Sequence, residues 1–188
     1  MANCLVIENI ASEEVLRGSA TQEDIDFVEA FANANRRCEA LAWRAIVRRE
    51  LGHGIEIRYD DYGAPKVNLP GTYISVSHSK GKVTVLFSDR PCAVDIEQTD
   101  RDFSRVANRY LSQSEQVVAE QYDIWAEMWC AKEALYKYYI KGGLDFVEHI
   151  SISDYDSDRG VLSCSILGGE PIEVNVKREG NLAIAVID

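Results

Sequence analysis

The sequence contains no long apolar run. None of its apolar stretches approaches the roughly 20 residues that a membrane-spanning helix requires, so we expect no insertion into a membrane. Residues 1–10 have the pattern of a strand and lack the basic start and apolar middle of a secretory signal. The sequence therefore predicts a cytoplasmic protein.

Paired cysteines are also missing. The five cysteines are scattered, odd in number and never arranged as C-x-x-C. A disulfide framework or a zinc site is usually recognised by such pairs. We therefore expect the cysteines to be reduced residues that contribute to packing.

The chain lacks an excess of positive charge. Its formal net charge is -11 at pH 7, whereas nonspecific nucleic-acid binding depends on Lys and Arg that neutralise phosphates. Nucleic acid is therefore not an expected partner.

One segment is locally basic and contains Arg36, Arg37, Arg44, Arg48 and Arg49. This segment is either a local phosphate site or a solvated helix face.

The order of helical and strand patterns predicts an α+β fold. A capped helix begins near Thr21, and a second helix runs from about Asn35 to Gly52. Strand patterns follow over residues 55–59, 73–77, 83–87 and 92–97, with a hairpin turn at residues 80–82. An S-x-x-E capping box at Ser112 opens a further helical region, interrupted near Asp123, and four short strands complete the chain.

This order suggests two α+β halves, residues 1–100 and 101–188. Weak similarity between residues 42–48 and 131–137 favours a repeat, although two amphipathic helices can also resemble each other by chance.

Two carboxylates project together from residues 93–97. Strand alternation places Asp95 and Glu97 on one face and Val94 and Ile96 on the other. Neighbouring carboxylates repel unless a cation or a proton separates them, and their oxygens suit magnesium. The pair predicts either a metal site or an ordinary solvated strand face.

The helix over residues 129–137 carries further polar groups. Its broad polar face collects Trp129, Lys132, Glu133, Tyr136 and Lys137, and we expect that face to border a groove or solvent. Alternatively, Glu133 and Lys137 simply form an i,i+4 ion pair.

A third motif, Ser77-His78-Ser79, ends a strand and could bind a phosphate through its hydroxyls and ring.

In order, the motifs Ser77-His78-Ser79, Ala93-Val94-Asp95-Ile96-Glu97 and Trp129-x-x-Lys132-Glu133-Ala134-x-x-Lys137 resemble those of surfactin-synthetase-activating 4'-phosphopantetheinyl transferases. The resemblance implies a monomer of two similar α+β halves related by a pseudo-twofold axis, with the active site between them. It also implies magnesium-dependent transfer of 4'-phosphopantetheine from coenzyme A to a serine of an apo acyl or peptidyl carrier protein. Adenosine 3',5'-bisphosphate would be released.

The resemblance also implies roles for single residues. The implied magnesium ligands are Asp95, Glu97 and Glu133, and the implied catalytic residues are Glu133, Lys137 and Asp95. Whether Glu133 acts as base, metal ligand or both stays open. The implied coenzyme A contacts are Arg36, Gly63, Ser77, His78 and Ser79.

The sequence departs from the family pattern at three positions. Ser75 and Ala93 replace a frequent Asn and Gly, which are small changes. Ala64 replaces a lysine that often assists nucleotide binding, and Lys66 is the nearest candidate to compensate.

Two other functions fit the sequence less well. A serine hydrolase built from Ser77 or Ser79 with His78 and Asp95 is disfavoured, because adjacent strand residues point to opposite faces and no G-x-S-x-G elbow is present. A non-catalytic module that binds coenzyme A or a carrier protein is disfavoured by the intact set of acidic residues and Lys137.

Overall fold

The computed structural model describes residues 3–188, which form two compact units. Unit 1 is Met1–Arg90 and unit 2 is Pro91–Asp188. The strand β6 (Ala93–Gln98) pairs antiparallel with β10 (Leu182–Ile187), near the end of the chain. This pairing places β6 in unit 2, so the division falls earlier than the position near residue 100 suggested by the sequence.

Unit 1 begins with a strand and three helices. After β1 (Cys4–Asn9) come α1 (Glu13–Ser19), α2 (Gln22–Glu29) and α3 (Ala34–Leu51). The predicted cap of α2 is present as a full capping box, in which Thr21 and Asp24 exchange side-chain and backbone hydrogen bonds. α3 ends before Gly52, whose φ of 104° favours glycine. The sequence did not predict α1.

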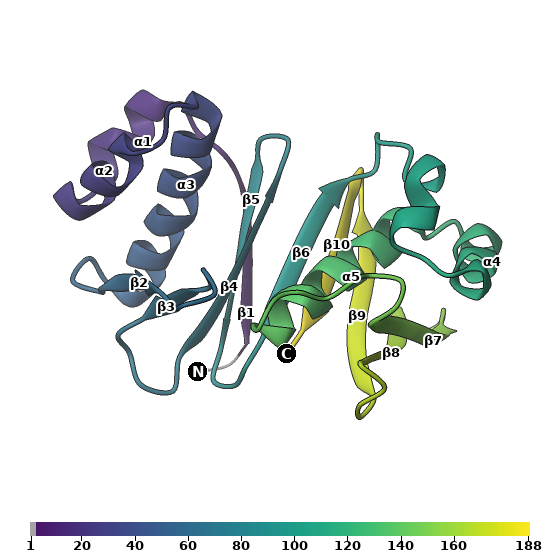
Figure 1. Ribbon diagram of the computed structural model, residues 1–188. Coiled ribbons are helices and arrows are strands. Elements are labelled where there is room, and N and C mark those ends of the chain that lie inside the picture. Colours follow the sequence, from purple (N-terminus) through teal and green to yellow (C-terminus); the bar gives the residue numbers. More distant parts are fainter. Residues whose placement is uncertain (1–2) are drawn as a thin grey trace. The chain divides into compact units, whose positions relative to one another are not determined.

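A three-stranded antiparallel sheet completes the core of unit 1, in the order β1-β5-β4. The two further strands of this sheet are β4 (Tyr73–Ser79) and β5 (Lys82–Ser88). Lys80 and Gly81 both have positive φ in the turn that joins them, as a tight hairpin requires. Figure 1 shows α3 beside this sheet, and alternate β5 residues pack in one apolar cluster with α3. A small separate sheet pairs β2 (Ile57–Tyr59) with β3 (Pro65–Val67).

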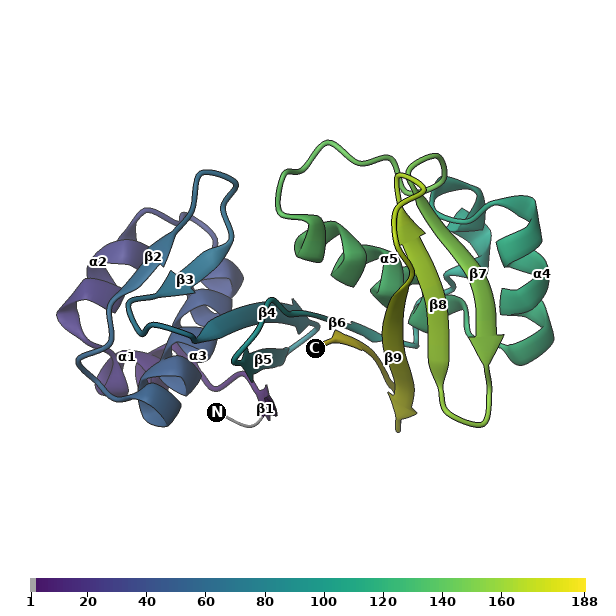
Figure 2. The ribbon, with the colours of Figure 1, turned by 90° about the horizontal axis from the view of Figure 1, so that it is seen from below.

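Unit 2 is built on a five-stranded antiparallel sheet in the order β6-β10-β9-β8-β7. Its remaining strands are β7 (Ile150–Asp156), β8 (Val161–Ile166) and β9 (Ile172–Glu179). Together with β10 they confirm the predicted group of four strands at the end of the sequence. Figure 2 shows β7, β8 and β9 side by side. Gly160 is needed in this sheet, because a Cβ atom there would lie 2.7 Å from the Val176 carbonyl oxygen.

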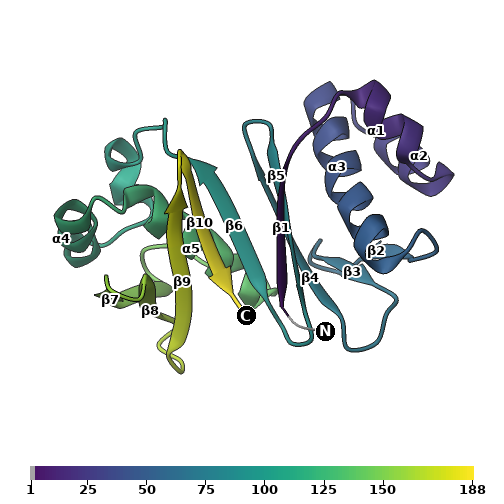
Figure 3. The ribbon, with the colours of Figure 1, turned by 180° about the vertical axis from the view of Figure 1, so that it is seen from behind.

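Two helices and a short 3-10 helix cover the sheet of unit 2. They are η1 (Ser104–Arg109), α4 (Gln113–Tyr122) and α5 (Trp125–Tyr139). The predicted capping box at Ser112 is confirmed, and the predicted interruption corresponds to Asp123, which ends α4 with a φ of 53°. α5 packs against β6 and β10 on one face of the sheet, in front of it in Figure 1 and behind it in Figure 3.

The cysteines lie both at the surface and in the core. None of the five cysteines, all of which lie within residues 3–188, forms a disulfide, and Cys130 and Cys164 are buried in the core of unit 2. Cys4 is exposed, so packing does not account for every cysteine.

Among residues 3–188, no helix combines the length and the apolar character that crossing a membrane would demand.

Candidate functional site

The two carboxylates of β6 lie on the face of the sheet that α5 covers. Asp95 and Glu97 share one face of β6 with Ala93, which belongs to the core beneath α5. The residues opposite them on β10 are Ala185 and Ala183, both fully buried. Both are small, and the side chain of Asp95 is only 8% exposed. The predicted alternation of this strand is therefore present at the sheet face that meets α5.

α5 adds a cation and a third carboxylate. Lys137 Nζ donates hydrogen bonds to Asp95 Oδ1 at 2.7 Å and to the Val94 carbonyl oxygen at 3.0 Å. These bonds connect the C-terminal end of α5 to β6. Glu133 precedes Lys137 by four residues and therefore lies on the same side of the helix.

The three carboxylates Asp95, Glu97 and Glu133, here called the acidic cluster, interact electrostatically. Burial raises the pKa of Glu133, and the negative charges of Asp95 and Glu97 raise it further, while Lys137 acts in the opposite direction. Burial raises the pKa of the nearby Cys130 thiol well above its usual value, and the same two acids contribute. The cluster therefore favours a cation or a proton.

The donor atoms of the acidic cluster suit magnesium. Carboxylate oxygens are preferred ligands of this hard cation, and a cation would relieve the repulsion that raises the pKa of Glu133. Within residues 3–188, no three His, Cys, Asp or Glu side chains are arranged so that they could bind a metal ion without moving. Oδ1 of Asp95 is bonded to Lys137. The chemistry fits magnesium, and coordination would require these side chains to move.

One expectation about α5 was wrong. Lys132, which the helical pattern placed on a groove-facing or solvent-facing side, is fully buried. Trp129 is partly buried and packs against Phe103 and Tyr110, with ring centroids 6.0 and 5.1 Å apart. The pattern failed because α5 is covered on more than one side, and polar partners inside unit 2 satisfy the lysine. Glu133 and Lys137 are the residues of that face that meet the acids of β6.

In unit 1 the structure brings together two of the predicted coenzyme A contacts. Arg36 Nη1 lies 3.0 Å from His78 Nε2. Glu39, which the sequence analysis did not identify, lies 3.2 Å from Arg36 through Oε2 and 3.5 Å from His78 Nδ1 through Oε1. Its position three residues after Arg36 was the available signal, because such residues share a helix face. Ser77 and Ser79, on either side of the histidine in β4, are buried.

The basic segment of α3 is neither a continuous phosphate site nor a solvated face. Arg44 and Arg48 are buried and share the carboxylate of Asp24, with Arg44 Nε at 2.5 Å from Oδ1. Arg37 donates to both oxygens of Glu13, at 2.8 and 3.1 Å. Most of the segment therefore stabilises unit 1 internally, while the Arg36 side chain is 59% exposed.

The loop between β2 and β3 contains the glycine of the Tyr62-Gly63 motif. Gly63 has a φ of 83° and donates its amide to the Asp60 carbonyl oxygen at 3.0 Å. Side chains other than glycine rarely adopt this conformation. Lys66, the candidate to replace the lysine missing at Ala64, lies 3.5 Å from an oxygen of Asp60 and is 42% exposed.

Comparison with known proteins defines the class. Residues 91–187, just over half of the 188-residue chain and nearly all of unit 2, match the model of the 4'-phosphopantetheinyl transferase superfamily. The chain belongs to this superfamily, as the three motifs indicated, and its α+β architecture agrees with that assignment.

A particular relative is also similar. Over 109 residues the chain is 32% identical to "4'-phosphopantetheinyl transferase Sfp" of Bacillus subtilis (strain 168). The matched region is 53% of this chain and 49% of the relative, so the chain spans about half the length of the curated relative it matches.

Proposed function

We propose that this protein transfers the 4'-phosphopantetheine arm of coenzyme A to a serine of an apo acyl or peptidyl carrier protein and releases adenosine 3',5'-bisphosphate. The observation that carries the proposal is the contact between β6 and α5, where Lys137 is hydrogen-bonded to Asp95 and the charges of the acidic cluster and Lys137 act on Glu133. This contact lies inside the region that matches the superfamily.

The proposed chemistry uses charge and position. Phosphoryl transfer needs alignment and neutralisation of charge more than covalent participation by the protein. A magnesium ion held by Asp95, Glu97 and Glu133 would supply positive charge next to the phosphate oxygens. Lys137, oriented by Asp95 and the Val94 carbonyl, would stabilise charge that develops on those oxygens.

Glu133 is the proposed base for the carrier serine. Burial and neighbouring acids raise its pKa, which moves this carboxylate closer to the range in which a general base is effective. In unit 1, Arg36 and His78 present two nitrogen groups 3.0 Å apart, which suits binding of the phosphates of coenzyme A. We also propose coenzyme A contacts for Ser77, Ser79 and Gly63, as the resemblance to the family implies.

The test is intact-mass analysis of several apo carrier proteins incubated with this protein, coenzyme A and magnesium. A parallel reaction contains a chelator, and coenzyme A binding is measured separately by calorimetry. We expect a chelator-sensitive gain of one phosphopantetheine on a carrier serine. Coenzyme A binding without a gain on any carrier would favour the non-catalytic binding module instead.

We propose further that the protein acts as a monomer in the cytoplasm and does not bind nucleic acid. The lack of disulfides among the five cysteines, all within residues 3–188, suits a reducing compartment, and the net charge of -11 opposes association with phosphate backbones. Light scattering coupled to size-exclusion chromatography tests the oligomeric state, and a dimer mass would contradict it.

A further inference from the structure

Lys132 precedes Glu133 directly and has no role in the proposed chemistry. Its side chain is fully inside unit 2. The ammonium nitrogen donates to Glu115 Oε1 at 2.9 Å, to the Phe146 carbonyl oxygen at 2.9 Å and to the Ile150 carbonyl oxygen at 2.5 Å. An ammonium group has three donors, so these acceptors satisfy it completely.

Glu115 accepts hydrogen bonds from two more backbone groups. Its Oε2 accepts from the Ser112 amide at 2.7 Å, and its Oε1 accepts from the Ile152 amide at 2.7 Å. The Lys132–Glu115 pair therefore joins the start of α4, the middle of α5, the connection after α5 and the first residues of β7.

Stability alone is a poor explanation for this pair. The loss of hydration on burying two charges offsets much of their attraction, and apolar residues of similar size often serve equally well. A buried pair with fixed partners instead specifies one arrangement of the segments that it joins. Here the segment specified includes α5, on which Lys132 and Glu133 are adjacent.

We propose that Lys132, through Glu115, is a positioning residue that fixes the rotation and depth of α5 so that Glu133 and Lys137 meet Asp95. The proposal rests on the proposed function. Successive helix residues are separated by roughly 100° around the axis, so any rotation that released Lys132 from its acceptors would also turn Glu133 away from β6. The same anchoring holds Lys137, five residues further along α5.

The first variant is Lys132→Met, which keeps much of the side-chain volume and removes the three donors. We expect kcat for transfer to fall on the order of 100-fold, as misplacement of catalytic groups by about 1 Å can produce. KM for coenzyme A should change less than about threefold, because binding groups are proposed elsewhere.

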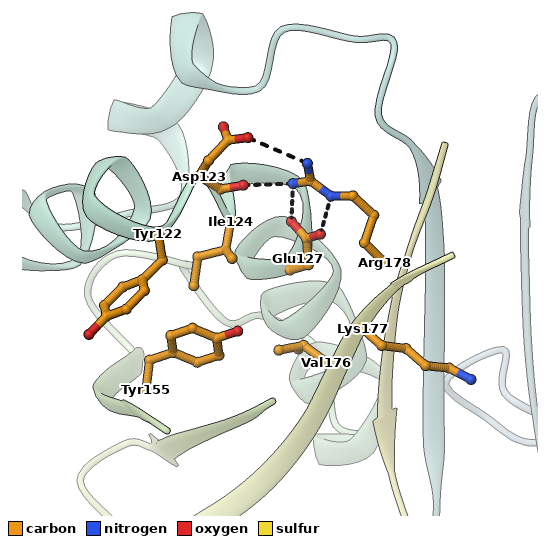
Figure 4. Close-up of a pocket in the computed structure, with 8 residues that line it drawn as sticks. All are labelled: Tyr122, Asp123, Ile124, Glu127, Tyr155, Val176, Lys177 and Arg178. Atoms are coloured by element: carbon orange, nitrogen blue, oxygen red, sulfur yellow. Dashed lines mark hydrogen bonds and ion pairs between the residues drawn. The ribbon is translucent and has the colours of Figure 1, made fainter. Parts of the chain in front are cut away.

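The matched control is Glu127→Gln, on the same helix. Figure 4 shows Glu127 with Arg178, whose Nε and Nη2 donate to the two carboxylate oxygens at 2.6 and 2.9 Å. Its side chain is 4% exposed, like that of Glu115. It lies nearer the N-terminal end of α5, so we expect kcat to stay within about threefold of wild type. Equal kcat losses in both variants would overturn the proposal.

A double variant separates positioning from stability. Lys132→Met leaves the Glu115 charge buried without its cation, and adding Glu115→Gln removes that charge. We expect Tm to recover toward wild type in the double variant while kcat stays low, because the ties to the two carbonyl groups remain absent. Recovery of kcat in parallel with Tm would show that Lys132 only stabilises the fold and would overturn the proposal.

A readout without turnover separates this proposal from the proposed function. If the wild-type protein transfers nothing to any carrier, the proposed function fails, and amide hydrogen exchange of α5 then tests positioning. We expect peptides from the second half of α5 to exchange about tenfold faster in Lys132→Met than in Glu127→Gln. The two variants are compared at denaturant concentrations that give equal global stability. Identical exchange would overturn the positioning role.

Discussion

In unit 1 the buried carboxylate of Asp24 is matched by two arginines, whereas in unit 2 the acids facing α5 repel one another. Burial alone would raise the pKa of Asp24, but hydrogen bonds from Arg48 and Arg44 outweigh it and lower the pKa to about 2. Burial raises the pKa of Glu133, and the other acids of the cluster reinforce the rise even with Lys137 nearby. The same residue types thus produce opposite electrostatic outcomes.

The difference separates structure from chemistry. A carboxylate whose charge is compensated by buried partners holds two elements together, as Asp24 holds α2 to α3. Carboxylates that repel one another cost stability and are expected where a cation or substrate completes the balance. The comparison predicts that substitutions at Asp24 reduce stability and that substitutions in the acidic cluster reduce activity.

The largest expected effect is on the stability of unit 1. Asp24→Ala should lower the free energy of unfolding by about 3 to 5 kcal/mol, because it leaves Arg44 and Arg48 buried without their shared carboxylate. Urea denaturation followed by circular dichroism measures the loss. Asp26→Ala, on the exposed side of the same helix, is the control and should change stability by less than about 0.5 kcal/mol. Similar losses in both variants would contradict the structural role of Asp24.

The next effect is on transfer. Asp95→Asn and Glu133→Gln should each lower the transfer rate at saturating magnesium by at least about 100-fold, or about 2.7 kcal/mol, because each removes a charge proposed to act on the reacting phosphate. Rates come from the intact-mass assay under single-turnover conditions. Glu120→Gln, an exposed carboxylate on α4, should retain the wild-type rate. Near-normal rates in both cluster variants would rule out the proposed site.

Local patterns predicted much of the fold. Strand alternation gave β4, β5 and β6, and the capping boxes at Thr21 and Ser112 gave the starts of α2 and α4. Neither α1 nor the three-residue strand β3 was predicted, because short elements carry little periodicity and depend on their neighbours.

The candidate site was less predictable. Motifs identified Asp95, Glu133 and Lys137, but periodicity placed Lys132 with them. Glu115 and the Phe146 and Ile150 carbonyl groups, which satisfy Lys132, are between 14 and 18 residues away in sequence. Such contacts exist only after the chain has folded, so a helical pattern does not distinguish a buried, satisfied cation from an exposed one.

Acid titration should also distinguish the two regions. Because the pKa of Asp24 is about 2 in the folded protein and 3.8 when unperturbed, its stabilisation is complete above about pH 4 and is lost as the pH falls toward 2. The loss should be about 2 kcal/mol. Urea midpoints of the wild type and Asp24→Asn, measured across this range, isolate the contribution from other acids. Parallel pH profiles for the two proteins would contradict it.

The smallest expected effect has the opposite sign. In a chelator at neutral pH, Glu133→Gln should raise the free energy of unfolding by about 0.2 to 1 kcal/mol, the range of interactions between partly exposed charges. Because burial and the neighbouring acids raise the pKa of Glu133, its ionised carboxylate opposes folding at pH values above the usual pKa of glutamate. Glutamine carries no charge and removes this opposition. Thermal unfolding with chelator, and then with magnesium, measures both states. Magnesium should stabilise the wild type more than Glu133→Gln, whereas a variant less stable than wild type in chelator would show that this carboxylate, like Asp24, is structurally compensated.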